Sequence, residues 1–194
     1  MAPSARRRER FTRVLEQRLP DLTIVIENIH DPHNVSAILR TCDAVGAMRA
    51  ELLYTLEPFP KIGKKSSSSA SKWIDRRKHT SVQECYATLR SEGFRIFATR
   101  LDATAVSLYD CDLTTAVALV LGNEHRGVSD EAAAQADGLI SIPMRGMIES
   151  LNVSVAAAVC LYEAYRQRRA RGILNTSAFP PARLAALLEE WLAR

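Results

Sequence analysis

The sequence predicts an α/β fold in which a parallel sheet is flanked by helices. Apolar segments with the length of a strand alternate along the chain with segments that carry helix caps, and this alternation is typical of a parallel sheet covered on both faces. The run "AVALVL", residues 116–121, is apolar at every position, as expected for a strand that is buried on both sides. The length of 194 residues suffices for one domain with a full hydrophobic core.

Each expected strand leads into a segment with recognisable helix or turn signals. Asp31 is expected to cap the first helix of the sheet domain, with Pro32 in its first turn and Gly46 at its end. Strands are expected at 22–27, 51–54, 94–99, 116–121 and 139–143. The further helices are expected at 81–93, 129–138, 151–169 and 181–192.

The helix expected at 151–169 has an unusual distribution of side chains. It is apolar on nearly every side as far as Leu161 and then becomes basic. We therefore expect its first half to be buried and its second half to be exposed.

A different kind of segment, from Lys61 to Ser71, is rich in serine and lysine and is expected to be a mobile loop.

The composition excludes several classes of protein. No apolar run approaches the ~20 residues of a membrane helix, and the amino-terminal residues lack the apolar segment of a secretory signal. These features predict a cytoplasmic protein with no membrane partner. The four cysteines form no C-x-x-C pair and the eight glycines form no G-x-G, so neither a zinc site nor a Rossmann dinucleotide site is expected. His30 and His33 lack a third ligand at a telling spacing, and no metal is expected.

Arginines are concentrated in two parts of the chain, although the net charge is only +4. The two clusters consist of Arg6, Arg7, Arg8, Arg10, Arg13 and Arg18, and of Arg166, Arg168, Arg169 and Arg171. Arginine clusters with few acidic neighbours are suited to phosphate backbones. A solvated helix face is the alternative interpretation of either cluster.

Polar side chains follow three of the expected strands. In open α/β sheets, ligands bind beyond the carboxyl ends of the strands, and these loops hold residues that are costly to bury without partners. The residues in question are Asn34, Arg40, Asn123, Glu124, Ser150 and Asn152. We expect the three loops to converge on one edge of the sheet.

These loops also carry three ordered motifs. The first has the pattern N-x-G-A-I-x-R-T-A-x-x-x-G and is met by Asn34, Ala37, Ile38, Arg40, Thr41 and Gly46, with Ser36 and Cys42 as small replacements. The second, G-x-E-x-x-G-[VL]-S, is met by Gly122, Glu124, Gly127, Val128 and Ser129. The third, I-P-M-x-G-x-x-x-S-L-N-V-S-V-A, runs without a gap from Ile142 to Ala156. With these motifs the sequence resembles the SpoU/TrmH family of RNA 2′-O-methyltransferases.

The resemblance implies a fold and a function. The family fold is an α/β sheet whose carboxyl-terminal part forms a deep trefoil knot (the SPOUT-type knot), and this would divide the chain into a basic helical extension at 1–20, a knotted methyltransferase domain at 21–172 and a helical extension at 173–194. The implied activity is S-adenosylmethionine-dependent 2′-O-methylation of a tRNA ribose, that of the D-loop guanosine at position 18. The implied partners are tRNA and a second copy of the chain in a homodimer, with no DNA.

The resemblance also implies roles for individual residues. Residues of the catalytic site would be Arg40, Asn34, Glu124, Ser150 and Asn152. The cofactor would be held by Thr99, Leu101, Gly122, Ile142, Met144 and Leu151, and tRNA phosphates by exposed Arg7, Arg10, Arg166 and Arg168. Because a guanidinium stays protonated, Arg40 is better suited to stabilising developing alkoxide and phosphate charge than to acting as a base.

Simpler interpretations exist for the same residues. Arg40 could form an ion pair with Asp43 or Glu51, Asn34 could make a hydrogen bond at a helix N-terminus, and Glu124 could be an acceptor that fixes a loop. Ser150 could cap the long helix, with Asn152 in its first turn. At the level of function, the alternatives are a ribosomal RNA methyltransferase of the same family and a non-catalytic RNA-binding module. The ribosomal RNA enzymes carry an added amino-terminal domain, whereas about twenty residues precede the first expected strand here.

Overall fold

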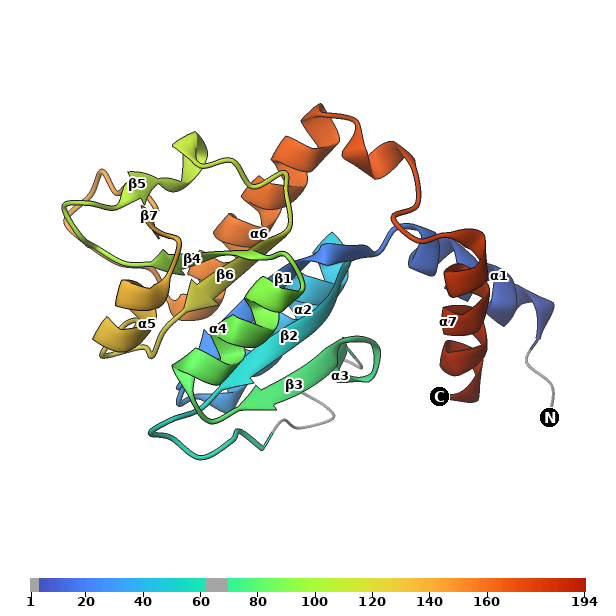
Figure 1. The fold of residues 1–194 in the computed structure, drawn as a ribbon, viewed down its shortest axis with the longest axis horizontal. Coiled ribbons are helices and arrows are strands. Elements are labelled where there is room, and N and C mark those ends of the chain that lie inside the picture. Colours follow the sequence, from blue (N-terminus) through green and yellow to red (C-terminus); the bar gives the residue numbers. More distant parts are fainter. Residues whose placement is uncertain (1–3, 62–69) are drawn as a thin grey trace.

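Seven strands form one sheet in the computed structural model, which describes residues 4–61 and 70–194 (Figure 1). The strand order is β3-β2-β1-β6-β4-β7-β5, and every neighbouring pair is parallel. The strands are β1 (Leu19–Glu27), β2 (Ala47–Leu53), β3 (Asp75–His79), β4 (Arg95–Thr99), β5 (Val106–Ser107), β6 (Val117–Leu121) and β7 (Gly138–Ser141). The helices are α1 (Ala5–Glu16), α2 (Pro32–Val45), α3 (Ala70–Trp73), α4 (Val82–Ser91), α5 (Asp130–Gln135), α6 (Val153–Ala170) and α7 (Pro181–Ala193), with 3₁₀ turns at Leu108–Asp110 and Ile173–Asn175.

Helices cover both faces of the sheet, and successive strand residues therefore enter different cores. In β1, Ile24 and Ile26 contribute to the core beneath α2 and α6, whereas Val25 contributes to the core beneath α4 and α5. The same alternation occurs in β6, where Leu119 belongs to the first core and Val120 to the second. The predicted parallel sheet with two covered faces is confirmed.

The helix caps lie where the sequence places them. The Asp31 carboxylate accepts a hydrogen bond from the His33 amide at 2.8 Å, and α2 ends at Gly46, whose φ of 90° lies in the left-handed region. The Ser129 hydroxyl accepts from the Ala132 amide at 3.1 Å and begins α5. Local capping chemistry is thus sufficient to set these helix boundaries.

Two strands were not expected, and two others begin at least three residues earlier than expected, one of them β1, at Leu19 rather than at Leu22. β3 has the sequence "DRRKH" and is an edge strand paired with β2, and β5 has two residues. β2 begins at Ala47 rather than at Glu51. The segment expected to be a mobile loop falls largely in residues 62–69, outside the described residues, and Ala70 already belongs to α3.

The expectation that α6 is buried in its first half and exposed in its second is wrong. Val155 and Tyr162 are 47% and 51% exposed, whereas Glu163 and Arg168 are buried. The reason is helical geometry, because Val155 and Tyr162 are seven residues apart and share the face that points away from the sheet. Burial along α6 therefore follows the face of the helix and not the half.

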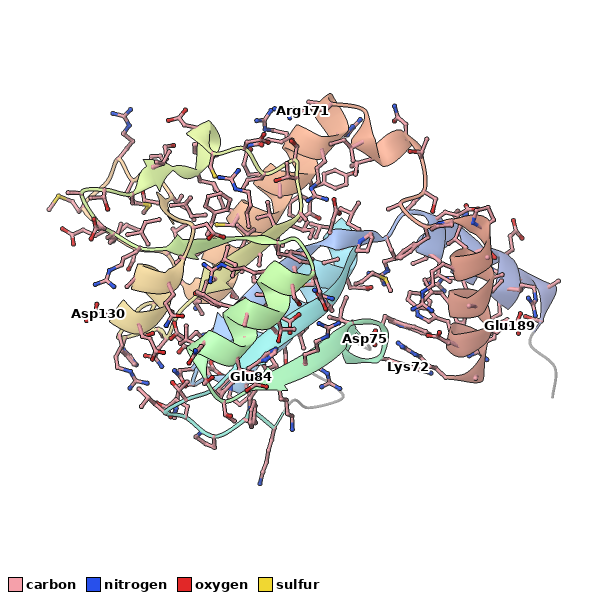
Figure 2. The ribbon with its side chains drawn as sticks, in the orientation of Figure 1. Lys72, Asp75, Glu84, Asp130, Arg171 and Glu189 are labelled. Carbon is pink, nitrogen blue, oxygen red and sulfur yellow. The ribbon has the colours of Figure 1, made fainter. Side chains whose placement is uncertain are left out.

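The first and last helices pack against each other beside the sheet (Figure 1). Leu15 of α1 and Trp191 of α7 are buried in their shared core, and Trp73 of α3 packs against it. Figure 2 labels Glu189, which accepts a hydrogen bond from Arg8 of α1 at 2.8 Å. At the carboxyl end of α7, Arg194 donates to the carbonyl of the labelled Lys72 at 2.8 Å and to the carboxylate of the labelled Asp75 at 3.1 Å. No helix in the described ranges is long and apolar enough to cross a membrane.

Candidate active site

A cavity of about 460 Å³ opens at the carboxyl ends of β4, β6 and β7. This volume is within the usual range for a small-molecule site. Its lining contains all six residues expected to hold a cofactor, which are Thr99, Leu101, Gly122, Ile142, Met144 and Leu151. Glu124, Ser150 and Asn152 line the same cavity.

The loop after β6 folds tightly back on itself at the wall of this cavity. The Asn123 amide donates to the Gly127 carbonyl at 3.0 Å, and the Gly127 amide donates to the Asn123 carbonyl at 2.8 Å. A β-carbon at Gly122 would lie 2.1 Å from the Gly127 carbonyl carbon and from the Val128 nitrogen. Since no side chain fits there, glycine is required for the turn that shapes the cavity.

Glu124 is the centre of a hydrogen-bond network that joins the loops. Its carboxylate accepts from the His30 amide at 3.0 Å, from the Asp31 amide at 3.2 Å and from Nδ2 of Asn34 at 2.9 Å. Burial alone would raise the pKa of Glu124, but the hydrogen bonds from Asn34 and the two backbone amides outweigh it, and the pKa is lowered. Glu124 is therefore an ionised acceptor at neutral pH.

The network continues from Asn34 to the first turn of α6. With Nδ2 of Asn34 bound to the carboxylate, its Oδ1 accepts from Nδ2 of Asn152 at 3.2 Å. Oδ1 of Asn152 in turn accepts from the Ser154 amide at 2.9 Å, which makes Asn152 the N-cap of α6. Ser150 is exposed and does not cap this helix. The prediction that the three polar loops converge is confirmed.

Arg40 has a different environment from the network. It is exposed, and it forms no hydrogen bond or ion pair with any residue in the described ranges. The partners that a structural role would use are engaged elsewhere, because Asp43 pairs with Arg18 and Glu51 pairs with Arg49 and His79. The ion-pair alternative for Arg40 is therefore not formed.

The arginines expected to contact RNA fall into two groups. Arg7 and Arg10 are exposed on α1, and Arg166 is exposed although it makes two hydrogen bonds of 2.8 Å to Glu163. Arg168 contradicts the prediction, since it has no exposed surface.

The burial of Arg168 has a clear physical cause. Its guanidinium donates to the Leu113 carbonyl at 3.1 Å, to the Asp21 carboxylate at 2.5 Å and to the Thr115 carbonyl. These acceptors lie at the amino ends of β1 and β6, on which this face of α6 packs. Arg168 is therefore not available to a phosphate.

Two asparagines that support the site were not assigned roles from the sequence. Asn28 follows β1 with a φ of 48°, and its Oδ1 accepts from the amides of Thr55, Leu56 and Glu57 at 2.9, 3.0 and 3.2 Å. Nδ2 of Asn123 donates to the Asn28 carbonyl at 2.7 Å. For Asn28 the available signal was the tolerance of asparagine for the left-handed region, and for Asn123 it was the position of a polar residue directly after a buried strand.

Histidines and carboxylates do not gather into a metal site. His30 lies near Glu57, with 3.5 Å between Nδ1 and Oε2, and the part of the chain that the structure describes holds no group of three or more His, Cys, Asp or Glu suited to a metal ion. The carboxylate of Glu124 is instead bound by two backbone amides and the Asn34 side chain.

The sequence profile of the SpoU rRNA Methylase family matches residues 21–162. This chain belongs to that family. The tRNA (guanosine(18)-2′-O)-methyltransferase of Thermus thermophilus is 45% identical over 188 residues, covering 97% of this chain and 96% of the relative. The enzyme of the same name from Escherichia coli is 40% identical, covering 93% of this chain and 80% of the relative.

Solved structures of family members agree with the fold. The A. aeolicus TrmH/SpoU tRNA-modifying enzyme superimposes with a TM-score of 0.90 at 37% identity, covering 97% of this chain and 95% of that one. The SpoU methyltransferase AviRb of Streptomyces viridochromogenes, solved in complex with AdoMet, has a TM-score of 0.66 at 28% identity and covers 79% of this chain and 59% of that one. Members of this SpoU family therefore share the sheet that carries the cavity.

Proposed function

We propose that this SpoU-family chain transfers a methyl group from S-adenosylmethionine to the ribose 2′-hydroxyl of guanosine 18 in tRNA. The observation that carries the proposal is the extent of the similarity. The Thermus relative aligns with 97% of this chain, a span too long to omit either terminal helix, whereas the 23S rRNA (guanosine-2′-O-)-methyltransferase of Pseudomonas syringae aligns with 78%. A cytoplasmic location, predicted from the sequence, agrees with a tRNA substrate.

The cavity fits S-adenosylmethionine in size and in chemistry. Leu121, Ile142 and Leu151 provide apolar walls for an adenine, and the carboxylates of Glu124 and Glu149 suit a ligand with cationic groups. The turn at Gly122 brings backbone, and no side chain, to the cavity wall. When bound, this cofactor supplies an electrophilic methyl group on a sulfonium.

The residues of the site have separate tasks in methyl transfer. The network from Glu124 through Asn34 to Asn152 fixes three loops relative to one another, so that a ribose hydroxyl can be held in line with the methyl group. Arg40, which is exposed and unpaired among the described residues, is free to stabilise the charge on the hydroxyl oxygen and on a neighbouring phosphate. Ser150 offers an exposed hydroxyl at the cavity wall.

The terminal segments are assigned to tRNA binding. Residues 1–20 and 173–194 contribute α1 and α7, which lie beside the sheet domain of residues 21–172. Arg7 and Arg10 present exposed guanidiniums from α1, and Glu163, which is buried, holds Arg166 on the exposed side of α6. Phosphate contact is the role that these positions support best.

We further propose that the chain forms a homodimer through the outer face of α6 and the loop before it. Met147 is fully exposed and Ile148 is 62% exposed, next to the half-exposed Val155 and Tyr162. An apolar surface of this kind is typical of a site for another protein, and a second copy would also bring its own groups toward the cavity. Analytical ultracentrifugation tests the dimer, and Tyr162→Glu should shift it to a monomer.

A trefoil knot is proposed for the region in which α6 packs against the segment that precedes β6. Gln167 donates to the Cys111 carbonyl at 2.9 Å, and its Oε1 accepts from the Leu113 amide at 2.9 Å. Pulling the chain by its two ends tests the knot, because a knotted chain stops short of the contour length of an unknotted one. Full extension would reject it.

The methylation itself is tested with transcribed tRNA and labelled S-adenosylmethionine. We expect label in wild-type tRNA and none in tRNA with a 2′-deoxyguanosine at position 18. Label in a 23S rRNA fragment alone would make the chain a ribosomal RNA enzyme, and RNA binding without any label would make it a binding module. Calorimetry should show binding of S-adenosylhomocysteine and not of NAD.

A further inference from the structure

Arg126 lies on the loop after β6 and lines the cavity. Its side chain is 52% exposed, and among the described residues it has one polar contact, a hydrogen bond of 2.8 Å from Nη2 to Oε1 of Glu57. A guanidinium carries five N–H donors, so most of those on Arg126 stay available to a ligand. Neither this arginine nor Glu57 has a role in the network around Glu124.

The backbone on both sides of this pair is fixed. The Arg126 amide donates to Oδ1 of Asn123 at 3.2 Å, within the turn closed by the two bonds between Asn123 and Gly127. The Glu57 amide donates to Oδ1 of Asn28 at 3.2 Å, and Asn28 is bound in turn to Asn123. A closed ring of contacts therefore connects the loop after β2 with the loop after β6.

Glu57 holds the guanidinium from one side only. The hydrogen bond from Arg126 lowers the pKa of Glu57, with His30 contributing in the same direction, so the carboxylate is ionised at neutral pH. The Glu57 side chain is 21% exposed, and that of Arg126 is more than twice as exposed. The carboxylate thus restricts the orientation of Arg126 and leaves its outer donors facing solvent.

Other cations at the cavity are held differently. Arg100 also lines the cavity, and its Nη2 donates to the Asp130 carboxylate at 2.6 Å. Asp130 is 94% exposed, so its ion pair is on the surface, whereas the partner of Arg126 is anchored to the backbone ring. Arg126 is therefore the cavity arginine with the best-defined orientation.

We propose that Arg126 binds a phosphate that flanks the target ribose and that Glu57 is the positioning residue that orients it. The inference rests on the proposed function, because a ribose inside an RNA chain carries a phosphodiester on each side. A 2′-hydroxyl that reaches the cavity must leave these phosphates near its mouth, where Arg126 lies. Guanidinium groups of restricted orientation match the paired oxygens of a phosphate.

The test compares four variants in tRNA binding, methylation and thermal unfolding. Arg126→Ala should raise KM for tRNA about tenfold and reduce the salt slope of binding by about one phosphate contact, with S-adenosylhomocysteine affinity unchanged. Glu57→Gln keeps the charge of Arg126 and should lower kcat several-fold with the salt slope unchanged. The matched control is Arg90→Ala, since Arg90 is 43% exposed and paired with Asp137 on the surface.

The fourth variant separates a phosphate contact from a structural ion pair. Glu57→Arg combined with Arg126→Glu restores an ion pair with the charges exchanged. We expect it to recover the thermal stability lost in Arg126→Ala and not the affinity for tRNA. Recovery of both would overturn the proposal, as would a normal KM and salt slope in Arg126→Ala. If wild type methylates no tRNA but Arg126→Ala still weakens RNA binding, the phosphate contact stands and the proposed substrate falls.

Discussion

Arg18 and Arg168, near the amino ends of β1 and β6, are buried and bonded to protein, whereas Arg126, on the loop that follows β6, is half exposed. Arg168 and Arg18 donate to backbone carbonyls and carboxylates and are at most 2% exposed. On the loop after β6, Arg126 has one polar side-chain partner, and the exposed Arg40, in the second half of α2, has none among the described residues. The same type of side chain thus stabilises the fold at Arg18 and Arg168 and stays available to a ligand at Arg126 and Arg40.

Exposure and hydrogen-bond partners, and not local charge density, therefore decide the role of an arginine. Arg166 and Arg168 are two residues apart in one basic cluster. One lies on the outer face of α6 and the other under it. From the cluster alone, Arg166 and Arg168 would both be assigned to phosphate contact.

The largest effect is expected at Arg168. Arg168→Ala leaves the Asp21 carboxylate and three backbone carbonyls without their donor, and should lower the free energy of unfolding by about 3 kcal/mol. Arg169→Ala, at an exposed neighbour with no polar partner in the described chain, should change it by less than ~0.5 kcal/mol. Urea denaturation measures both. Equal stability of the two variants would remove the distinction between the two ends of the sheet.

Arg40→Ala should have the complementary effect. We expect methylation to fall at least ~100-fold, which corresponds to about 2.7 kcal/mol of transition-state stabilisation. The free energy of unfolding and the affinity for S-adenosylhomocysteine should stay unchanged, because Arg40 has no partner in the described chain. Single-turnover assays and calorimetry check this. Activity above a few per cent of wild type would assign Arg40 a structural role.

Glu124 tests the network between the loops. Its folded-state pKa is lowered below 4.5, so its contribution to stability is complete above this pH and is lost as the pH falls through the folded value. Glu124→Gln should cost about 1 kcal/mol at pH 7, and the difference from wild type should shrink below pH 4.5. Urea unfolding over a pH series measures it. A difference that grows at acid pH would contradict the ionised carboxylate.

The smallest effect is expected at Arg166, which should be changed without Arg168 because Arg168 is buried. Arg166→Ala should raise KM for tRNA about threefold and flatten the salt dependence of binding by about one contact. The methylated nucleotide should not change. Filter binding over a salt series, with Arg169→Ala beside it, gives the comparison. Superimposable curves for Arg166→Ala and wild type would reject the phosphate contact.

The sequence predicts those elements of the fold that are determined by neighbouring residues, such as apolar runs and helix caps. The run at 116–121 had to be a strand buried on both faces, and Asp31 and Gly46 bound α2 through capping chemistry. β3 could not be found in this way, because its charged residues are stabilised by partners distant in sequence. Arg77 pairs with Glu92, and His79 with Glu51.

The residues of the site could be predicted from the motifs, but the hydrogen bonds between them could not. Spacing placed Glu124 and Asn152 in loops that converge, but it contained no information on which amide faces which oxygen. The burial of Arg168 depends on the angle at which α6 crosses β1 and β6, a property of the packed structure. Glu57 matches no motif, and its link to Arg126 joins residues 69 apart.

The bond between Arg168 and Asp21 also bears on how the protein is made. It joins residues 147 apart, and at ribosomal rates of 5–20 residues per second the two are synthesised about 7 to 30 seconds apart. β6, one of the two neighbours of β1 in the sheet, is likewise made well after β1, whereas the other neighbour, β2, follows at once. The first strand of the sheet must therefore wait with one of its two edges unpaired, in a nascent chain that holds only part of its core.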